Sequence, residues 1–463
     1  MEARNWFVPV ALIAWPLVAI VFYRTMSWAH ATLATILGGL LFLPPEASIK
    51  FQMIPAFDKN TVPNLCALIG CLFFAGRHRR VRAGFGLAEI LAMTYVISPI
   101  FTSALNNDSI IAGSITLPGV GYYDGFSSAI YNALFLLTFF IGRYFFREEI
   151  DIEEILRALV IAGVIYSVLA LFEMRMSPQL SRWVYGYFNS SYASESRSGG
   201  FRPVVFMING LSLSFFMMTA FLATLAFWRS NVRFKYSSPS FVSGYLGLVV
   251  ILCKSAGALV YAVIGGFFVR WMKPKLQLRI AVLIASIGLL YPVLRLTEQF
   301  PTKILLEVAS TFSDDRANSL AFRFDQEEKL LAHATQRIVF GWGRYGRNRV
   351  YDEESGKDES ITDGEWILTF GQFGFVGFLA QFGLLSLPVF RAASAARNSS
   401  PKEMIFLAAL ALIVALTVIE QLPNASLTPW TWLLVGALLG RGEYLRSRQR
   451  QKSHSNDGRD GYI

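Results

Sequence analysis

Residues 336–349, QRIVFGWGRYGRNR, bring together the residue types that chemistry on a phosphate or a sugar requires. Arg344 and Arg347 carry planar, permanently charged guanidinium forks, which suit phosphate oxygens. The glycines between them allow tight turns and a close approach of the backbone to a ligand. Trp342 and Tyr345 are suited to lie against the apolar face of a sugar ring, and they are equally suited to anchor the chain at a lipid interface.

Two carboxylates follow this run, at the end of the acidic stretch YDEESGKDESITDGEW. Asp363 and Glu365 stand at the predicted start of a helix, where acidic residues commonly cap the first turn. A carboxylate in that place is also a candidate general base. The sequence leaves both roles open for each residue, so Asp363 and Glu365 are the catalytic candidates.

Three further arginines are candidates for binding an anion. Arg197 and Arg202 flank SGGF, just before a predicted helix. Arg323 lies in 319–339, which has helical character and places Arg323 and Glu327 on one face. An i,i+4 ion pair with Glu327 is the simpler account of Arg323, and such a pair contributes only about a few tenths of a kcal/mol.

The elements that must position these residues are membrane helices. Of the 463 residues, 54% are hydrophobic, and the mean hydropathy is +0.44. Apolar runs of membrane-spanning length recur along the chain, which predicts an all-α polytopic membrane protein with about 12–13 transmembrane helices. We expect helices at roughly 7–23, 30–45, 62–76, 85–104, 126–146, 156–173, 204–228, 240–253, 255–271, 280–297, 365–390, 404–422 and 425–440.

The basic residues set the expected orientation. Short loops rich in Lys and Arg alternate with other loops; the basic ones are 77–82, 143–157, 229–235, 270–279, 391–402 and the tail from 441. The positive-inside rule assigns these to the cytoplasm. The loops at 105–125, 174–203 and 298–362 then face outward, and they hold or border every candidate residue. Thirteen spans place the N-terminus outside. With twelve spans, one early segment would not cross the membrane.

The chain divides accordingly into four parts. Transmembrane helices fill 1–297 together with the outward loop 174–203, a large outward loop covers 298–362, C-terminal helices cover 363–440, and 441–463 is a polar cytoplasmic tail. The net charge of +10 falls largely in membrane-flanking loops, so nucleic acid is not an expected partner. The three cysteines lie in apolar runs and indicate small core residues, not a metal site or a disulfide.

A cationic outward pocket, edged by carboxylates and aromatic side chains, predicts an anionic, sugar-bearing, membrane-bound ligand. A sugar linked to a polyprenyl diphosphate fits this description. The residues by themselves do not name a reaction.

Three segments, in their order, resemble the O-antigen ligase and Wzy polymerase superfamily. RSGGFRPVVFMING is similar to that family's Arg-Gly segment before a helix, and ILCKSAGALVYAVIGGFFV is similar to its short hydrophobic hairpin. RIVFGWGRYG, followed by DGEWILTFGQFGFVGFLAQFG, resembles its hallmark, a Gly-x-Gly stretch in a large periplasmic loop before a glycine-interrupted helix. The early segment LFLPPEASIKFQMIPAFDKNTVPNL is similar as well, so the resemblance covers roughly 40–440.

The resemblance implies a GT-C-like fold with one large periplasmic loop, in the bacterial inner membrane, and an active site facing the periplasm. It implies a glycosyltransferase without metal or cofactor that takes glycan from an undecaprenyl diphosphate donor. The family's donor-binding arginines correspond best to Arg197, Arg202 and Arg323, and then to Arg344 and Arg347. The implied partners are undecaprenyl-diphosphate-linked glycans, the lipid bilayer, and a chain-length regulator or export machinery.

The chain departs from the family's pattern at a position that distinguishes ligases from polymerases. Ligases, which transfer glycan to lipid A core, carry a His in the segment that enters the helix after the large loop. That segment here reads ITDGEW, and the nearest histidine is His333. We therefore favour a polysaccharide polymerase, which extends a lipid-linked repeat unit with Asp363 or Glu365 as the base, and keep the ligase as the alternative.

Two alternatives are not enzymes. A transporter for the same lipid-linked oligosaccharide would carry ionisable residues and paired broken helices at mid-membrane. The predicted spans hold few ionisable residues, which favours chemistry at the surface over passage. A scaffold for an export complex is the other alternative.

Overall fold

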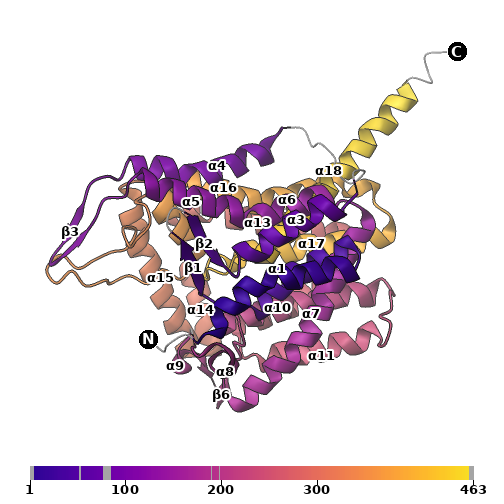
Figure 1. Ribbon diagram of the computed structural model, residues 1–463, viewed down its shortest axis with the longest axis horizontal. Coiled ribbons are helices and arrows are strands. Elements are labelled where there is room, and N and C mark those ends of the chain that lie inside the picture. Colours follow the sequence, from indigo (N-terminus) through magenta and orange to yellow (C-terminus); the bar gives the residue numbers. More distant parts are fainter. Residues whose placement is uncertain (1–4, 52–53, 77–84, 189, 198, 458–463) are drawn as a thin grey trace.

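The computed structural model describes residues 5–51, 54–76, 85–188, 190–197 and 199–457, which form one helical bundle (Figure 1). Eight helices are long and apolar enough to cross a membrane, and four shorter apolar helices accompany them. Together with the last helix, they correspond one to one with the predicted apolar runs. The prediction of a helical, polytopic chain is confirmed to this extent.

The bounds of these helices follow the predicted runs closely, although the predicted helix at 126–146 is interrupted at Leu136. The long ones are α1 (Phe7–Thr25), α4 (Leu87–Ala104), α5 (Tyr122–Phe135) with α6 (Leu137–Phe145), α7 (Glu149–Met176), α10 (Gly210–Arg229), α13 (Pro274–Leu296), α16 (Glu365–Ala395) and α17 (Pro401–Glu420). The shorter ones are α2 (Trp28–Phe42), α3 (Thr61–Phe74), α11 (Pro239–Leu252) and α12 (Ala256–Trp271), and the last helix is α18 (Pro429–Asp457).

The connections contain shorter elements. Helices α8 (Leu180–Tyr185) and α9 (Tyr192–Glu195) precede α10, whereas α14 (Thr302–Phe312) and α15 (Asp314–Thr335) lie between α13 and α16. The helical character predicted for 319–339 is confirmed in α15. Three antiparallel hairpins pair β1 (Ser48–Phe51) with β2 (Ile54–Asp58), β3 (Ile110–Ala112) with β4 (Ile115–Leu117), and β5 (Ser196–Arg197) with β6 (Gly200–Phe201).

The bundle has two ends of different character. The loop end holds the three hairpins with α8, α9, α14 and α15, at the left of Figure 1. The predicted basic loops meet at the opposite end, which we call the basic end: Lys402 Nζ lies 2.8 Å from Glu153 Oε2, and Arg441 donates to the Arg147 carbonyl at 3.0 Å. The predicted basic stretch 77–82 lies outside the described residues.

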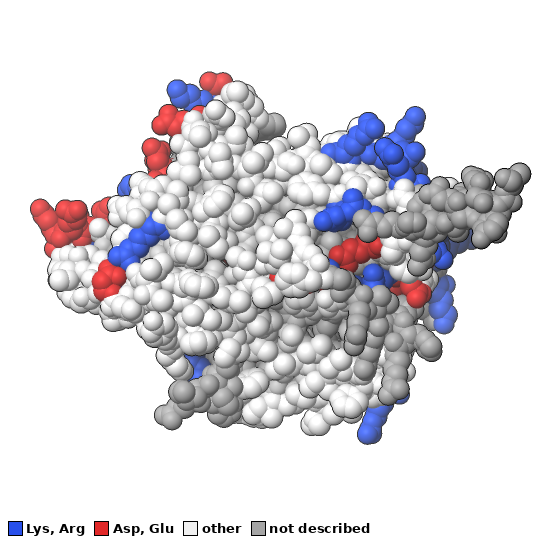
Figure 2. All heavy atoms as spheres, turned by 90° about the horizontal axis from the view of Figure 1, so that it is seen from above, with Lys and Arg blue, Asp and Glu red and all other residues white. Residues whose placement is uncertain are grey.

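Charge separates the two ends at the surface. Figure 2 shows Lys and Arg gathered at the basic end, a cluster of Asp and Glu at the tip of the loop end, and an almost uncharged surface between them. An uncharged band between two polar ends is what a bilayer requires. The asymmetry of Lys and Arg is the feature on which the positive-inside rule depends.

The chain begins at the loop end. Asn5 donates from its side-chain amide to the Val184 carbonyl at 2.8 Å, within α8. Tyr185, one residue further, donates to the carbonyl of Phe42 at the end of α2. Because α1 starts and α2 ends at the loop end, both early helices cross the bundle. The N-terminus thus lies at the loop end, and α18 runs out of the basic end (Figure 1).

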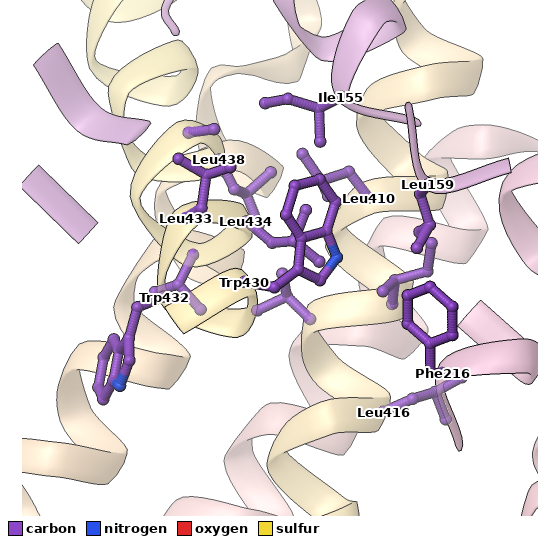
Figure 3. Packing of buried hydrophobic residues seen from close by; sticks show 14 of the residues in the cluster. Ile155, Leu159, Phe216, Leu410, Leu416, Trp430, Trp432, Leu433, Leu434 and Leu438 are labelled. Atoms are coloured by element: carbon purple, nitrogen blue, oxygen red, sulfur yellow. The ribbon is translucent and has the colours of Figure 1, made fainter. Parts of the chain in front are cut away.

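Helices α17 and α18 form the centre of the bundle. Figure 3 shows Leu410 of α17 and Trp430 of α18 packed among Ile155 of α7 and Phe216 of α10. These side chains are almost entirely removed from the surface. A helix that is apolar on all sides can be buried in this way.

Glycines allow α6 and α18 to touch along their backbones. A Cβ atom on Gly436 would lie 2.0 Å from the Phe139 carbonyl oxygen, and one on Gly440 would lie 2.3 Å from the Arg143 carbonyl oxygen. Gly142 lies equally close to α18 from the other side. Small residues spaced four apart are the usual means by which membrane helices approach, since lipid supplies no hydrophobic drive between them.

Replacing Gly436 by Leu should therefore force α6 and α18 apart. We expect a loss of at least ~1–3 kcal/mol, the usual cost of overpacking, and a lower thermal midpoint in detergent, measured by the temperature dependence of the monodisperse size-exclusion peak. The matched control is Gly244→Leu, since a Cβ on Gly244 of α11 would meet open space. Equal midpoints for the two variants would contradict this packing.

Candidate functional site

Helix α16 is broken near the loop end. Gly374 has φ 68° and ψ −167°, a conformation that glycine adopts without the steric penalty of a side chain. The amide groups that the break frees are paired: Phe375 and Val376 donate to the carbonyls of residues 338–339, at 2.7 and 3.2 Å. The break is thus filled by the loop that precedes GWG.

The same loop pairs with α16 on the other side of the break. Trp342 and Gly343 donate from their backbone amides to the carbonyls of residues 371–372, at 2.9 Å each. A Cβ on Gly341, whose φ is 70°, would lie 2.6 Å from backbone atoms of Gln372 and Gly374. Glycine was expected here to let the backbone approach a ligand. The approach in the structure is instead to α16.

Arg347 holds this loop against the β3–β4 region. Its side chain is buried, with 1% of the residue exposed. One terminal nitrogen donates to the carbonyls of Asp108 and Pro118, at 2.8 and 3.0 Å, while Nε donates to the Trp342 carbonyl at 3.1 Å. The guanidinium is therefore occupied by protein acceptors.

Trp342 is held between two side chains. The Arg337 guanidinium lies 4.2 Å from the indole ring centroid on one side, and the His333 ring stacks on the indole at 4.3 Å. The indole nitrogen donates to the His333 carbonyl at 2.9 Å. Arg337 also pairs with Asp108 at 2.7 Å, and this guanidinium holds the pKa of the Asp108 carboxyl below its usual range. Trp342 and Arg347, both predicted to bind substrate, thus fix the loop in place.

The Arg344 side chain points toward Tyr131 and Phe373, and it is held by fewer hydrogen bonds than that of Arg347. Its guanidinium carbon lies 5.8 Å from the ring centroid of Tyr131 and 5.4 Å from that of Phe373, and its one hydrogen bond, to the Asn132 amide oxygen, is long at 3.5 Å. Tyr345, the neighbouring candidate, has 62% of its surface exposed. Of the predicted arginines in this loop, Arg344 is therefore the one placed to accept an outside anion.

Glu365 is the first residue of α16 and lies near Arg344. Its carboxylate accepts a hydrogen bond from Gln381 at 2.7 Å, and Gln381 accepts one from Thr369 at 2.6 Å. This relay fixes the orientation of the carboxylate. Arg344 and Glu365 interact electrostatically, but no ion pair within 4 Å joins them.

A cavity of about 320 Å³ lies next to Tyr131, the residue over which Arg344 is placed. Tyr131 lines it and also carries Arg344 over its ring, so the cavity and Arg344 share a wall. Lys59 and Asn60 line it from the turn before α3, and hydroxyl groups of Ser426 and Thr428 line it from the turn after α17. Lys59 is buried and donates to a backbone carbonyl at 2.8 Å, and burial lowers its pKa to about 7.

Arg323 and Asp363 meet at a second cavity, of about 180 Å³. Arg323 Nε lies 3.8 Å from an Asp363 carboxylate oxygen, and the Arg323 guanidinium donates to the Pro423 carbonyl at 3.2 Å. Both side chains are partly exposed, at 31% and 48%. Because Pro423 borders this cavity and Ser426 borders the other, the short segment after α17 separates the two.

Glu327 takes a different partner from the one predicted. Its carboxylate accepts hydrogen bonds from Tyr291 at 2.9 Å and from Trp366 at 3.2 Å, and lies 3.6 Å from Arg295. Burial raises the pKa of Glu327. It therefore ties α15 to α13 and α16, and the predicted i,i+4 ion pair with Arg323 is wrong.

Arg202 lies in a different part of the loop end. It is buried, 3.6 Å from the Glu195 carboxylate, and its stem packs over Gly210 at the start of α10. The side chain of Arg197 lies outside the described part of the chain. The resemblance assigns Arg202 and Arg323 to the same donor, whereas in the structure Arg202 pairs with Glu195 and Arg323 pairs with Asp363.

The structure thus brings Arg344 together with Glu365, and Arg323 together with Asp363, on either side of one turn. Sequence reasoning missed Lys59 and Tyr131, which complete the larger cavity. A signal was present at Lys59, because FDKN places two adjacent charges just before an apolar helix. Tyr131 gave none, since an aromatic residue in a membrane helix is commonplace.

No protein-family model matches the chain, and none of the curated proteins matches it. Within the described ranges, no group of three or more His, Cys, Asp and Glu side chains is arranged to hold a metal ion.

Replacing Arg347 by Ala should loosen the loop without touching the cavities. The change removes the donor to three carbonyls, of which that of Trp342 is buried, and an unsatisfied buried acceptor costs ~1–3 kcal/mol. We expect faster amide hydrogen exchange in residues 106–120 and 338–349, measured by mass spectrometry. Arg349→Ala serves as the control because Arg349 pairs with Asp358 near the surface, where such pairs contribute little. Equal rates of amide hydrogen exchange in both variants would contradict the positioning role of Arg347.

Replacing Lys59 by Met should flatten the dependence of stability on pH above neutrality. The pKa of Lys59 is about 7 in the folded protein and keeps its ordinary value of 10.5 in the unfolded chain. Between these values the unfolded chain binds more protons, so the wild-type free energy of unfolding rises as pH increases. Thermal midpoints at about pH 7 and about pH 9 measure the rise. The exposed Lys357→Met is the control, and parallel curves for both variants would contradict the burial of this amine.

Proposed function

We propose that this protein is a bacterial polysaccharide polymerase, which transfers glycan from an undecaprenyl diphosphate donor to a lipid-linked repeat unit at the periplasmic face. The observation that carries the proposal is the electrostatic interaction of Arg344 with Glu365, together with the position of Arg344 over Tyr131, which lines a cavity in the loop end. A guanidinium suits a diphosphate, and a carboxylate beside it suits the removal of a proton from a sugar hydroxyl. The resemblance of RSGGFRPVVFMING and GWGRYG with DGEW to the superfamily supports the same reading.

The reaction is a substitution at the anomeric carbon of the donor. The acceptor hydroxyl oxygen attacks C1, its proton passes to Glu365, and the bond between C1 and the phosphate oxygen breaks. Undecaprenyl diphosphate leaves with the electron pair of that bond. Arg344 neutralises the charge that builds on the leaving group, and a preorganised donor of this kind contributes ~3–4 kcal/mol.

Glu365 fits the role of base better than Asp363 does. The Gln381–Thr369 relay fixes the Glu365 carboxylate without supplying a cation to it. Asp363 already faces Arg323 at 3.8 Å, so its carboxylate is engaged by a cation and is less available to a sugar hydroxyl. We assign Asp363 to positioning Arg323 at the second cavity.

The environment of His333 favours a polymerase over a ligase. The His333 ring stacks on Trp342, one ring nitrogen lies 3.0 Å from the Arg347 carbonyl, and burial lowers the pKa of the imidazole. This histidine therefore belongs to the loop's internal packing, away from Glu365. The catalytic histidine that the resemblance implies for ligases has no counterpart in ITDGEW.

The break in α16 favours an enzyme over a transporter. In transporters, the freed backbone groups of a broken helix face a substrate or an ion. Here the amides of Phe375 and Val376 donate to the loop at 338–339 instead. Lining both sides of the break with protein suits a fixed scaffold for Arg344 more than a moving gate.

Replacing Arg344 by Lys should shorten the polymer strongly. A lysine keeps the charge but loses the planar fork, so we expect a drop in polymerisation of ~10²–10³-fold, comparable to the loss of one preorganised donor. Glu365→Gln should abolish polymerisation while protein yield stays normal. Polymer length on a gel, in cells that lack the native gene, reports both.

Arg349→Lys is the matched control for Arg344→Lys, because Arg349 lies in the same loop and pairs with Asp358. It should leave polymer length unchanged. Normal polymer from Arg344→Lys, or normal polymer from Glu365→Gln, would rule out this assignment of roles.

A further inference from the structure

The cations at the basic end fall into two groups, and most near the bundle axis are paired. Arg143 lies 2.7 Å from Glu89 and 2.8 Å from Glu443. Lys402 and Arg157 both reach Glu153, and Arg441 pairs with Glu403. Cations that are paired with carboxylates in this way are not available to bind an anionic ligand.

A second group surrounds a cavity of about 580 Å³ between α13, α17 and the 3₁₀ turn η2 (Ala396–Asn398) that follows α16. Lys275 and Arg279 come from α13, and Arg397 comes from η2. Within the described part of the chain, no carboxylate lies within 4 Å of any of the three. Three cations that share one cavity without an acid repel one another, and an anion would relieve that repulsion.

The remaining wall of this cavity is apolar. It consists of Leu278, Val282, Ala393, Ala396 and Met404. A free, fully hydrated anion gains nothing from such a surface. A ligand with both a phosphate and an alkyl part would match the wall as well as the cations.

Helix α13 continues this pattern away from the cavity. Leu283, Ile287 and Leu290 follow Arg279 at helical spacing on one face, and all three are exposed. The stripe runs along α13 from the cations toward α14 at the loop end. It supplies a track for an acyl chain whose headgroup sits at the basic end.

We propose that this cavity binds the headgroup of an anionic phospholipid, with its phosphate between Arg279 and Arg397 and an acyl chain along the exposed face of α13. A lipid is favoured over free phosphate by the apolar wall and the stripe above it. Basic pockets between helices, on the side of the positive loops, are known places for such headgroups. The site does not depend on the reaction at the loop end.

A neighbouring cavity at the same end supplies an internal comparison. It has a volume of about 420 Å³ and is lined by Arg143, Arg391 and Arg446, but also by Glu89 and Glu443. The two carboxylates offset the arginines, so this cavity has no strong preference for an anion. The proposed site differs because the described residues bring no acid to it.

Native mass spectrometry of the delipidated full-length protein in a neutral detergent, titrated with phosphatidylglycerol, tests the proposal. The wild type should retain phosphatidylglycerol at least ~10-fold more tightly than phosphatidylcholine. Each cation near a membrane surface contributes about fivefold to such binding, so Arg279→Gln with Arg397→Gln should weaken phosphatidylglycerol binding by roughly 25-fold.

The matched control removes two other exposed cations from the same end, Arg233→Gln with Lys235→Gln, and should weaken binding less than about twofold. Thermal midpoints of both double variants in detergent establish that each is folded. Equal weakening in the control would overturn the site in favour of a diffuse surface charge effect. Displacement of the lipid by millimolar inorganic phosphate or glycerol phosphate would overturn the role of the acyl chain.

Discussion

The arrangement of the loop end depends on the backbone hydrogen bonds between residues 338–343 and the broken helix α16. Gly374 opens the helix, and the loop supplies carbonyls and amides to both sides of the opening. Unpaired amides at that depth would cost several kcal/mol each, so the break and the loop require one another. The pairing fixes the backbone of Gly343, and thereby the point from which Arg344 extends toward Tyr131 and Glu365.

The arginines of residues 336–349 have different roles, and the role of each depends on how deeply its side chain is buried. Arg347 and Arg337 donate to the chain at 105–118 and hold the loop in place. Arg344 rests on aromatic rings and makes one long hydrogen bond within the described residues, so its guanidinium is oriented and keeps donors for a ligand. A site that must hold a diphosphate needs both kinds, because a guanidinium positions a leaving group only if its own loop does not move.

Helix positions were largely predictable from the sequence, because lipid enforces long apolar runs and leaves little room for other solutions. The sequence also singled out candidate carboxylates and arginines, since charged residues beside membrane helices are few. Their individual roles could not be assigned: Arg344 and Arg347 lie three residues apart with similar neighbours, and only the tertiary contacts show that one is buried and the other accessible. The partners of Glu327 and the contribution of Lys59 arise from segments far apart in the chain, which local spacing does not encode.

The central claim, that a glycan is transferred between lipid carriers at the loop end, is tested most directly in liposomes. Purified protein is reconstituted with a fluorescently labelled undecaprenyl-diphosphate-linked repeat unit, and the products are separated by size. The account predicts glycans of increasing length with release of undecaprenyl diphosphate. Labelled lipid that crosses the bilayer without elongation, or glycan transferred solely to added lipid A core, would contradict it.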